Sequence, residues 1–469
     1  MKKQRALVLG GSMAGMLAAR VLADHCDVTI VERDELPEGA VPRRGLPQAM
    51  HLHAVLSRGQ SLLEGWFPGL REELIRDGAV EADAGTELGW LSPFGWAASF
   101  ERGQIANVWL TRDFLDAHLR ARLRRDARVG WLEGCQVDEL VLDKSRRRVL
   151  GVRTTAGEVH EADLVVDATG RGSRLPKWLR ESGLAAPDEV EVDSGLTYSS
   201  ALLRLARPMP NGWKAVVVHA AAPHVLAAGF LSQVDGGRAM LTLSGQGGLP
   251  MPEEPQAALE FARRLRSPVV AELLEGAEWL SPLRITRATV NQRRHYERIQ
   301  LPAGVLPIGD SFCAFNPIYA QGITVAALEA DALSTLLRTN APGDPVLPAR
   351  AARAFARIIG FPWLAATGDD FRFATTRGRR PPGLRLAHAY LDRLFSASGR
   401  DPRVWLQVAR VLQFSDSPLS LYSPRMLWAA LRQPRPQALI GPVALPLALA
   451  SAVGQAHVHY PREHPVPQD

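Results

Sequence analysis

The sequence predicts an α/β fold with a parallel sheet, a second and largely antiparallel sheet inserted into the chain, and a helical C-terminal region. Three observations carry this prediction. The first 34 residues read as an apolar strand, a glycine-rich turn, a helix and a second apolar strand, which is the pattern of a parallel βαβ unit. Strand-like runs at residues 198–205, 215–218, 225–230 and 239–243 predict the antiparallel sheet. Beyond residue 350, helical patterns interrupted by proline predominate.

The opening βαβ unit predicts a dinucleotide site. A strand over residues 6–10 leads through the turn Gly10-Gly-Ser-Met-Ala-Gly15 into a helix over residues 16–23, and the following strand ends at Glu32. Glycines let the backbone approach a pyrophosphate, whose charge then lies at the helix N-terminus. A carboxylate about 20 residues after the turn can accept the hydroxyls of an adenosine ribose. Ser12 replaces the second glycine of the usual pattern, and its small hydroxyl can donate to a phosphate oxygen.

Length and composition indicate a protein of two or three packed units. The chain has 469 residues, of which 46% are hydrophobic. Its three cysteines, Cys26, Cys135 and Cys313, are too widely spaced for a disulfide framework or a zinc site, so we expect a reducing, cytoplasmic location. The first residues lead into the nucleotide strand and not into a signal sequence. The net charge of +6 comes mainly from arginines spread along the chain, so we expect no nucleic-acid partner.

The middle of the chain carries further elements around two histidines. His51 and His53 precede a helix predicted over residues 56–66. Two histidines without nearby cysteine or carboxylate partners fall short of a metal site, so we expect them to pack in the core or beside a cofactor. Residues 85–105 are rich in aromatic side chains that either line a pocket or fill the core. A helix over residues 111–124 is followed by short strands predicted at residues 129–137, 139–143, 148–154 and 159–166.

The apolar tail over residues 438–453 leaves two interpretations open. Pro442 and Pro446 interrupt it, and it is too short and broken to predict a membrane span. It can dock on the protein as a helix or loop. Alternatively, it can attach to a membrane surface and help a lipophilic substrate to enter.

Several separated motifs together resemble a known family. The strings Gly10-Gly-Ser-Met-Ala-Gly15, Glu32-Arg33, Arg112, Asp167-Ala-Thr-Gly170 and Gly309-Asp310 resemble the FAD-dependent monooxygenases of the p-hydroxybenzoate hydroxylase and squalene epoxidase type. The resemblance covers residues 1–340 in the expected order. Within that superfamily, the chain looks like the bacterial olefin epoxidases of polyether biosynthesis, of the lasalocid and monensin type, through Arg44-Gly-Leu-Pro-Gln48, His51, His53 and Asn316-Pro-Ile-Tyr-Ala-Gln-Gly-Ile-Thr324.

The resemblance implies a domain organisation. A Rossmann-like FAD-binding domain of the glutathione-reductase type would be discontinuous and comprise residues 1–85, 106–185 and 285–340. Residues 86–105 and 186–284 would form the inserted antiparallel substrate-binding domain. Residues 341–469 would form the helical C-terminal region.

The resemblance also implies roles for individual residues. The Asp310 carboxylate would accept the ribityl hydroxyls of FAD, and Val137 would lie where backbone groups bind adenine. Arg112 and Arg44 suit phosphate contacts, although either can instead form a surface ion pair. A helix beginning near residue 322 would direct its N-terminal dipole at the flavin pyrimidine ring. The expected cofactor-binding residues are therefore Gly10, Gly11, Ser12, Ala14, Gly15, Glu32, Arg33, Arg44, Arg112, Val137, Asp310, Pro317, Gln321, Gly322 and Ile323.

The activity implied is the insertion of one oxygen atom from O2 through a C4a-hydroperoxyflavin. The expected reaction is epoxidation or hydroxylation of a lipophilic polyketide or other natural-product intermediate, in antibiotic biosynthesis. Such chemistry needs a dry cavity more than a protein nucleophile, and Tyr319, beside the flavin loop, is the candidate catalytic group. Asp167 is followed by Ala-Thr-Gly where directly reduced hydroxylases carry glycine. The reductant is therefore either NADPH or reduced flavin supplied by a separate flavin reductase.

Three alternatives follow from the same superfamily. A flavin-dependent halogenase would carry a Trp-x-Trp-x-Ile-Pro motif and an essential lysine, but no lysine lies between Lys3 and Lys144. A prenyl-chain reductase of the geranylgeranyl type would consume no oxygen. A non-catalytic flavoprotein would bind the nucleotide and convert nothing. The expected partners are a lipophilic small molecule and O2, with at most peripheral membrane contact and no metal.

Overall fold

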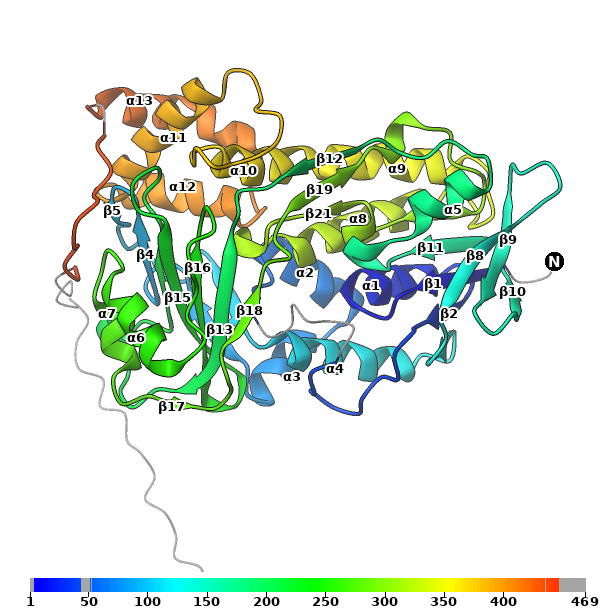
Figure 1. Ribbon diagram of the computed structural model, residues 1–469, viewed down its shortest axis with the longest axis horizontal. Coiled ribbons are helices and arrows are strands. Elements are labelled where there is room, and N and C mark those ends of the chain that lie inside the picture. The colour runs from blue at the N-terminus through cyan, green and yellow to red at the C-terminus, as the bar shows by residue number, and fades with distance from the viewer. Residues whose placement is uncertain (1–3, 44–50, 52, 435, 447–469) are drawn as a thin grey trace, which may run out of the picture.

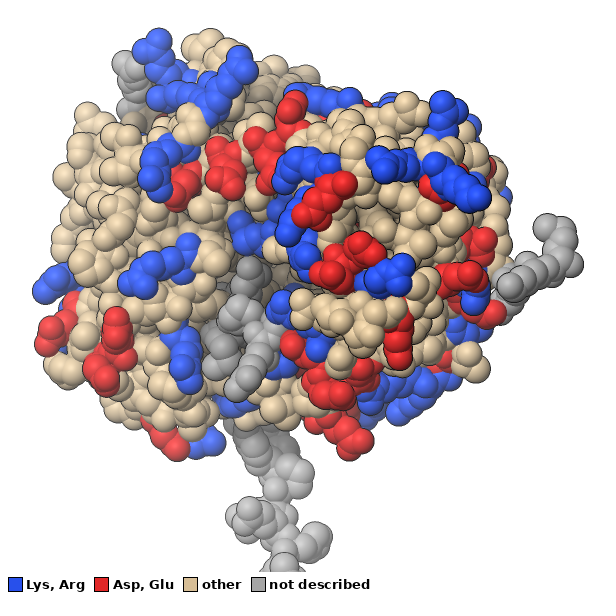
Figure 2. Space-filling model, turned by 45° about the vertical axis from the view of Figure 1, so that its right-hand side comes forward, with Lys and Arg blue, Asp and Glu red and all other residues tan. Residues whose placement is uncertain are grey.

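The computed structural model describes residues 4–43, 51, 53–434 and 436–446 (Figure 1). The predicted α/β fold is confirmed. A layered unit built on a parallel sheet lies beside a second unit built on a large antiparallel sheet, and helices from the C-terminal part cover the upper side of both in Figure 1. Acidic and basic side chains are intermixed on the face shown in Figure 2 and do not form one extended basic surface there.

The parallel sheet has five strands. Their order is β20 (Val305–Pro307), β11 (Leu164–Asp167), β1 (Arg5–Leu9), β2 (Asp27–Val31) and β7 (Val129–Leu132). Apolar residues dominate these strands because helices cover both faces of such a sheet. Leu9 of β1 pairs in register with Val31 of β2 and Asp167 of β11. The carboxyl ends of these neighbouring strands therefore lie at one edge, where ligands of open α/β sheets bind.

Helices enclose this sheet in one large core. Met16, Leu17 and Leu333 are fully buried within it. Helix α1 contacts α8 and α4, and α9 contacts α8 and β20. The helices of this unit are α1 (Met13–Leu22), α2 (Ser57–Trp66), α3 (Leu70–Arg76), α4 (Arg112–Arg124), α5 (Leu175–Glu181), α8 (Gly322–Leu337) and α9 (Leu347–Ile358).

The second large sheet has eight strands. All its pairings are antiparallel except that of β14 with β4. Helices α6 (Pro255–Arg263) and α7 (Val269–Leu274) contribute to its core through buried residues such as Ala258 and Val270. The strand order is β17 (Glu278–Trp279), β13 (Thr197–Arg204), β16 (Arg238–Gly245), β15 (Ala227–Val234), β14 (Ala215–Val218), β4 (Leu88–Ser92) and β5 (Gly95–Trp96), with β18 (Arg284–Thr286) paired to β13.

Three smaller sheets complete the β-structure of the described residues. Of the short strands predicted after the helix over residues 111–124, three form one of these sheets as β8 (Val137–Leu142), β9 (Val149–Thr154) and β10 (Val159–Glu161). A second sheet contains β12 (Glu189–Val192), β19 (Asn291–Arg294) and β21 (Cys313–Ala314). A third pairs β3 (Val80–Asp83) with β6 (Ala106–Trp109).

The remaining helices are α10 (Gly360–Asp370), α11 (Leu384–Ser398), α12 (Pro402–Leu412) and α13 (Pro424–Arg432). The last three share a core with Trp405 and Met426. Helix α9, by contrast, buries Leu347 and Phe355 in the core of the parallel sheet. No helix among the described residues is both long enough and apolar enough to cross a bilayer.

Several boundaries differ from the prediction; the strand predicted over residues 129–137, for example, ends at Leu132 in β7. The strand predicted over residues 159–166 is two strands, because the chain passes from the meander to the parallel sheet at Asp163, whose carboxylate accepts the Arg5 N–H at 2.9 Å. Helix α1 begins at Met13 and not at residue 16. The last three residues of the predicted glycine turn therefore belong to the first turn of a helix.

Candidate functional site

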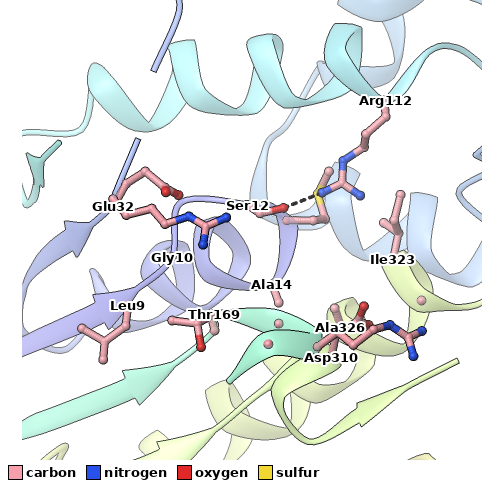
Figure 3. Close-up of a pocket in the computed structure, with 18 of the residues that line it drawn as sticks. Leu9, Gly10, Ser12, Ala14, Glu32, Arg112, Thr169, Asp310, Ile323 and Ala326 are labelled. Carbon is pink, nitrogen blue, oxygen red and sulfur yellow. Dashed lines mark hydrogen bonds between the residues drawn. The ribbon is translucent and has the colours of Figure 1, made fainter. Parts of the chain in front are cut away.

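A cavity of about 630 Å³ lies at the carboxyl edge of the parallel sheet. Its lining comes from the ends of β1, β2 and β11, the residues after β20 and the first turns of α1 and α8. Figure 3 shows Glu32 and Asp310 on opposite sides of this cavity, with Ser12 between them and Arg112 directed at Ser12 from above. Of the predicted cofactor-binding residues, the cavity is lined by Gly10, Ser12, Ala14, Glu32, Arg33, Arg112, Val137, Asp310, Pro317, Gln321, Gly322 and Ile323.

The glycine turn is held by close backbone contacts. Gly10 has a φ of +100°, and a Cβ there would lie 2.6 Å from the Ala168 carbonyl oxygen. A Cβ on Gly15 would lie 1.8 Å from the Gly10 carbonyl oxygen. Both positions therefore require glycine. Gly15 and Gly11 do not line the cavity, so their contribution is to shape the turn.

Glu32 closes one end of the cavity. Its Oε2 accepts the Gly11 N–H at 2.7 Å and its Oε1 accepts the Asp34 N–H at 3.2 Å. The side chain is almost completely buried. These two bonds leave further lone pairs on the carboxylate for hydroxyl groups in the cavity.

Two arginines lie beside the glycine turn. Arg112 donates from Nη2 to Ser12 Oγ at 2.8 Å and from Nε to Asp116 Oδ1 at 2.9 Å. Arg43 donates from Nη2 to Asp116 Oδ2 at 3.0 Å. Asp116 therefore fixes both guanidinium groups at the cavity wall. The predicted residue Arg44 lies outside the described residues, whereas its neighbour Arg43, which the prediction missed, lines the cavity.

Asp310 closes the other end of the cavity. It follows Gly309, which has a φ of +64°. Burial raises the pKa of the Asp310 carboxyl, against the attraction of Arg171, Arg112 and Arg294. The Gly309 N–H donates to Glu329 Oε2 at 2.6 Å. Burial raises the pKa of Glu329 to about 8, so a protonated carboxyl supports this turn at neutral pH.

The loop between β21 and α8 forms the wall next to Asp310. Asn316 Oδ1 accepts the Ile318 N–H at 3.0 Å and starts a short 3-10 turn over Pro317–Tyr319. Ala320 then adopts a left-handed conformation with a φ of 52°, an uncommon state for a residue with a Cβ. No side chain caps the first turn of α8. Its N-terminal amides are therefore available to an acceptor in the cavity.

Two consecutive carboxylates at the end of α10 hold this loop. Asp369 accepts the Tyr319 hydroxyl at 2.5 Å, and Asp370 accepts from Asn316 Nδ2 at 3.2 Å and from Asn291 Nδ2 at 2.6 Å. Burial, with a smaller contribution from Asp369, raises the pKa of Asp370 to about 7. Tyr319, the predicted catalytic group, does not line the cavity. Its hydroxyl donates to Asp369.

The two histidines are placed differently from each other. His51 Nδ1 lies 2.8 Å from Ser200 Oγ of the second sheet, and burial lowers the pKa of His51 to about 4. His53 lines the cavity. Burial, together with the charge of Arg112, lowers the pKa of His53 to about 3. Both rings are therefore neutral at physiological pH. No metal-ligating cluster among the described residues includes either of them.

Asp167 fixes the turn that forms one wall of the cavity. Asp167 is buried, and its Oδ1 accepts the Thr169 N–H at 3.0 Å and the Thr169 hydroxyl at 2.5 Å. The turn that follows brings Thr169, Gly170 and Arg171 to the cavity wall. Arg171 and Cys135 also line the cavity. Neither was predicted, because an isolated arginine or cysteine carries no motif.

The cavity residues fit a bound dinucleotide such as FAD. The polar atoms Gln321 Oε1, Asp34 Oδ2 and Arg171 Nε are buried without a hydrogen-bond partner in the described protein, and all three residues line the cavity. Buried polar groups are normally paired. These unpaired acceptors and donors can therefore bind a polar ligand in the cavity. The cavity also has a carboxylate at each end, with the N-termini of α1 and α8, which no side chain of the described residues caps, between them.

Comparison with solved structures defines the class of fold. PqsL of Pseudomonas aeruginosa, described as a probable FAD-dependent monooxygenase, is 18% identical with a TM-score of 0.60, over 79% of this chain and 98% of that chain. The flavin-dependent brominase Bmp2 is 16% identical with a TM-score of 0.62, over 87% of this chain and 93% of that chain. The chain shares its fold with these two proteins, as the sequence resemblance implied.

A closer relative is known at the level of sequence. Protein Rv3254 of Mycobacterium tuberculosis is 31% identical over 418 residues, which cover 85% of this chain and 87% of that protein. The chain belongs to the same family as Protein Rv3254. No family model matches it.

Proposed function

We propose that the protein is an FAD-dependent monooxygenase that transfers one oxygen atom from O2 to a lipophilic small molecule. The single observation that carries the proposal is the cavity with Glu32 and Asp310 at its two ends. It is supported by the fold shared with PqsL and Bmp2. The bound flavin would supply the redox and oxygen chemistry.

The residues of the cavity divide the work of holding such a cofactor. Glu32 would accept the ribose hydroxyls, and the first turn of α1 with Arg112 and Arg43 would neutralise the pyrophosphate. Asp310 would accept the ribityl hydroxyls. The first turn of α8, at Gly322, would place N–H groups against the pyrimidine edge, where negative charge develops on reduction.

The substrate would lie between the cofactor loop and the second sheet. Ile318 of the loop packs against a cluster formed by Val217, Ala228 and Phe230, with Trp90 beside it. An apolar wall of this kind orients a lipophilic molecule and excludes water from the reacting centre. This environment supports epoxidation or hydroxylation of a polyketide-like intermediate, as the motif resemblance implied.

The experiment measures cofactor content and oxygen use in the purified protein. We expect FAD to co-purify, and we expect a polyene substrate to become heavier by one oxygen atom with matching O2 uptake. NADPH alone and NADPH with a separate flavin reductase are compared, so that the reductant is identified in the same assay.

Each alternative gives a different result. A saturated product without O2 uptake would indicate a prenyl-chain reductase. A product that carries bromine or chlorine would indicate a halogenase, the class to which the brominase Bmp2 belongs. A protein that binds no flavin would overturn the proposal.

A further inference from the structure

Large apolar side chains are exposed together at the C-terminal end of the described chain. Leu419 and Tyr422 lie on a short 3-10 helix (Pro418–Tyr422), and Leu427, Trp428 and Leu431 lie on α13. Trp428 is 55% exposed and Leu431 is 82% exposed. These five residues are called the α13 surface below. Grouped exposure of this kind marks an interaction site, whereas single exposed apolar residues are ordinary.

Helix α13 has more apolar residues than its own packing needs. Met426 and Ala430, four residues apart, are buried in the core shared with α11 and α12. Leu427 and Leu431 are also four residues apart, each directly after one of the buried pair. Together with Trp428 they form a second face of the helix, and this face remains exposed. Residues four apart share a face of a helix. The buried pair is sufficient to attach α13, so the exposed face is free to contact another structure.

The segment that carries this surface has charges of one sign. The sequence contains no Asp or Glu between Asp416 and Glu463. The arginines within that interval include Arg425 and Arg432, which flank the exposed face of α13. The Arg432 guanidinium lies over the Trp428 ring, 3.4 Å from its centroid. The complementary partner is therefore anionic.

We propose that the α13 surface docks on an anionic lipid bilayer. Leu427, Trp428 and Leu431 would enter the boundary between headgroups and acyl chains, and Arg425 and Arg432 would contact lipid phosphates. A short helix with tryptophan and leucine on one face and arginine beside them has the composition of an interfacial element. The inference does not depend on the proposed activity.

A second copy of this chain fits the surface less well. Two copies related by a twofold axis would bring the same patch together. The arginines of both copies would then meet without an acidic partner, since the segment has none. The chain segment that follows α13 is bound to the second sheet. The Leu439 N–H donates to the Pro93 carbonyl at 2.8 Å, and Trp96 Nε1 donates to the Ala444 carbonyl at 2.8 Å.

The test is flotation of the full-length protein with lipid vesicles. We expect binding to vesicles of phosphatidylcholine mixed with phosphatidylglycerol and little binding to phosphatidylcholine alone, with release at high salt. The variant Arg425→Gln/Arg432→Gln should lower the partition coefficient about 30-fold, from two charges near the membrane. Trp428→Glu/Leu431→Glu should abolish binding.

The controls separate docking from misfolding and from other occupants. Leu150→Glu/Val159→Glu changes two exposed apolar residues on β9 and β10 and should leave vesicle binding unchanged. Thermal melting should be the same for all variants. Equal recovery with and without anionic lipid would overturn the proposal. A dimer that Trp428→Glu/Leu431→Glu dissociates, or binding that is lost only when the chain is ended at residue 446, would also overturn it.

Discussion

At the scale of single residues, the site depends on positions where one chemical group is required. Gly10 and Gly15 are required because any Cβ would collide with a backbone oxygen. Glu32 has two roles, because it accepts the Gly11 N–H within the turn and also presents its remaining lone pairs to the cavity. Asp310 has no comparable backbone partner. Its substitution therefore separates cofactor binding from the integrity of the turn better than substitution of Glu32.

Substitution Asp310→Ala is expected to release FAD from the protein. Loss of hydrogen bonds to a charged acceptor costs about 1.5–3 kcal/mol, which corresponds to an affinity roughly 10- to 100-fold lower. Flavin absorbance after gel filtration measures the occupancy. Asp331→Ala, on the outer side of α8, is the matched control and should keep full occupancy. Full occupancy in Asp310→Ala would contradict the assignment of the ribityl end.

The buried carboxyl of Glu329 predicts a pH dependence of stability. Its pKa is raised from 4.5 to about 8, so between these values the folded protein holds a proton that the unfolded chain releases. The free energy of unfolding should then fall as pH rises, by at most ~1.4 kcal/mol per pH unit. Glu329→Gln should flatten this part of the profile in urea titrations. Glu72→Gln, on the exposed side of α3, should not; identical profiles for Glu329→Gln and the parent would refute the prediction.

At the scale of elements, the conformation of the loop before α8 depends on contacts with another element of the structure. Ala320 has a left-handed conformation in this loop although it carries a Cβ and lacks the conformational freedom of glycine. The two ends of the loop are held by Asp369 and Asp370, which belong to α10. Helix α10, about fifty residues further along the chain, therefore sets the geometry of the cavity wall next to Asp310.

Tyr319 and Asp369 should act as one unit. We expect Tyr319→Phe and Asp369→Asn each to weaken FAD binding, and the double variant to be no weaker than either single variant, with a coupling energy of about 1 kcal/mol. Tyr390→Phe, whose hydroxyl contacts the Leu421 carbonyl, is the control. If Tyr319→Phe alone stopped turnover with FAD affinity unchanged, the hydroxyl would belong to the chemistry, as the sequence suggested.

The sequence predicted the elements that short-range patterns specify. The βαβ unit and the short strands after the helix over residues 111–124 are local, because the apolar period and the glycines that specify them lie within a few residues of one another. The tether from Asp369 and Asp370 joins residues about fifty positions apart, and nothing near Tyr319 indicates it. The start of α1 was misplaced because its first turn contains Gly15, which reads as turn and not as helix. Arg43 was overlooked because only the fold shows that its side chain reaches Asp116 at the cavity wall.

At the scale of the whole molecule, one buried arginine connects distant segments of the second unit. Arg266 donates from Nη2 to the carbonyls of Ser92 and His219, at 3.0 and 2.7 Å, and from Nη1 to the Leu439 carbonyl at 3.2 Å. Burial lowers the pKa of Arg266 to about 10, so it stays charged at neutral pH. It therefore joins the antiparallel sheet to the C-terminal segment.

Replacing this arginine should loosen the second unit and the C-terminal segment together. Arg266→Met leaves buried carbonyls without a donor and should lower the free energy of unfolding by about 2–4 kcal/mol. Scanning calorimetry measures the loss, and limited proteolysis near Leu439 should accelerate. Arg263→Met removes a half-exposed partner of Glu275 and should change neither. Unchanged proteolysis in Arg266→Met would show that the segment is held by its other contacts.

Alkylation of the Cys135 thiol can report whether the cavity is occupied. Cys26 and Cys313 are buried, whereas Cys135 is half-buried and lines the cavity next to Gln136 and Val137. Burial raises the pKa of the Cys135 thiol, so alkylation should be slow and most evident at alkaline pH. A nucleotide in the cavity would shield it. The mass shift from one alkylation event would then count empty molecules in a mixed population, without reference to colour or turnover.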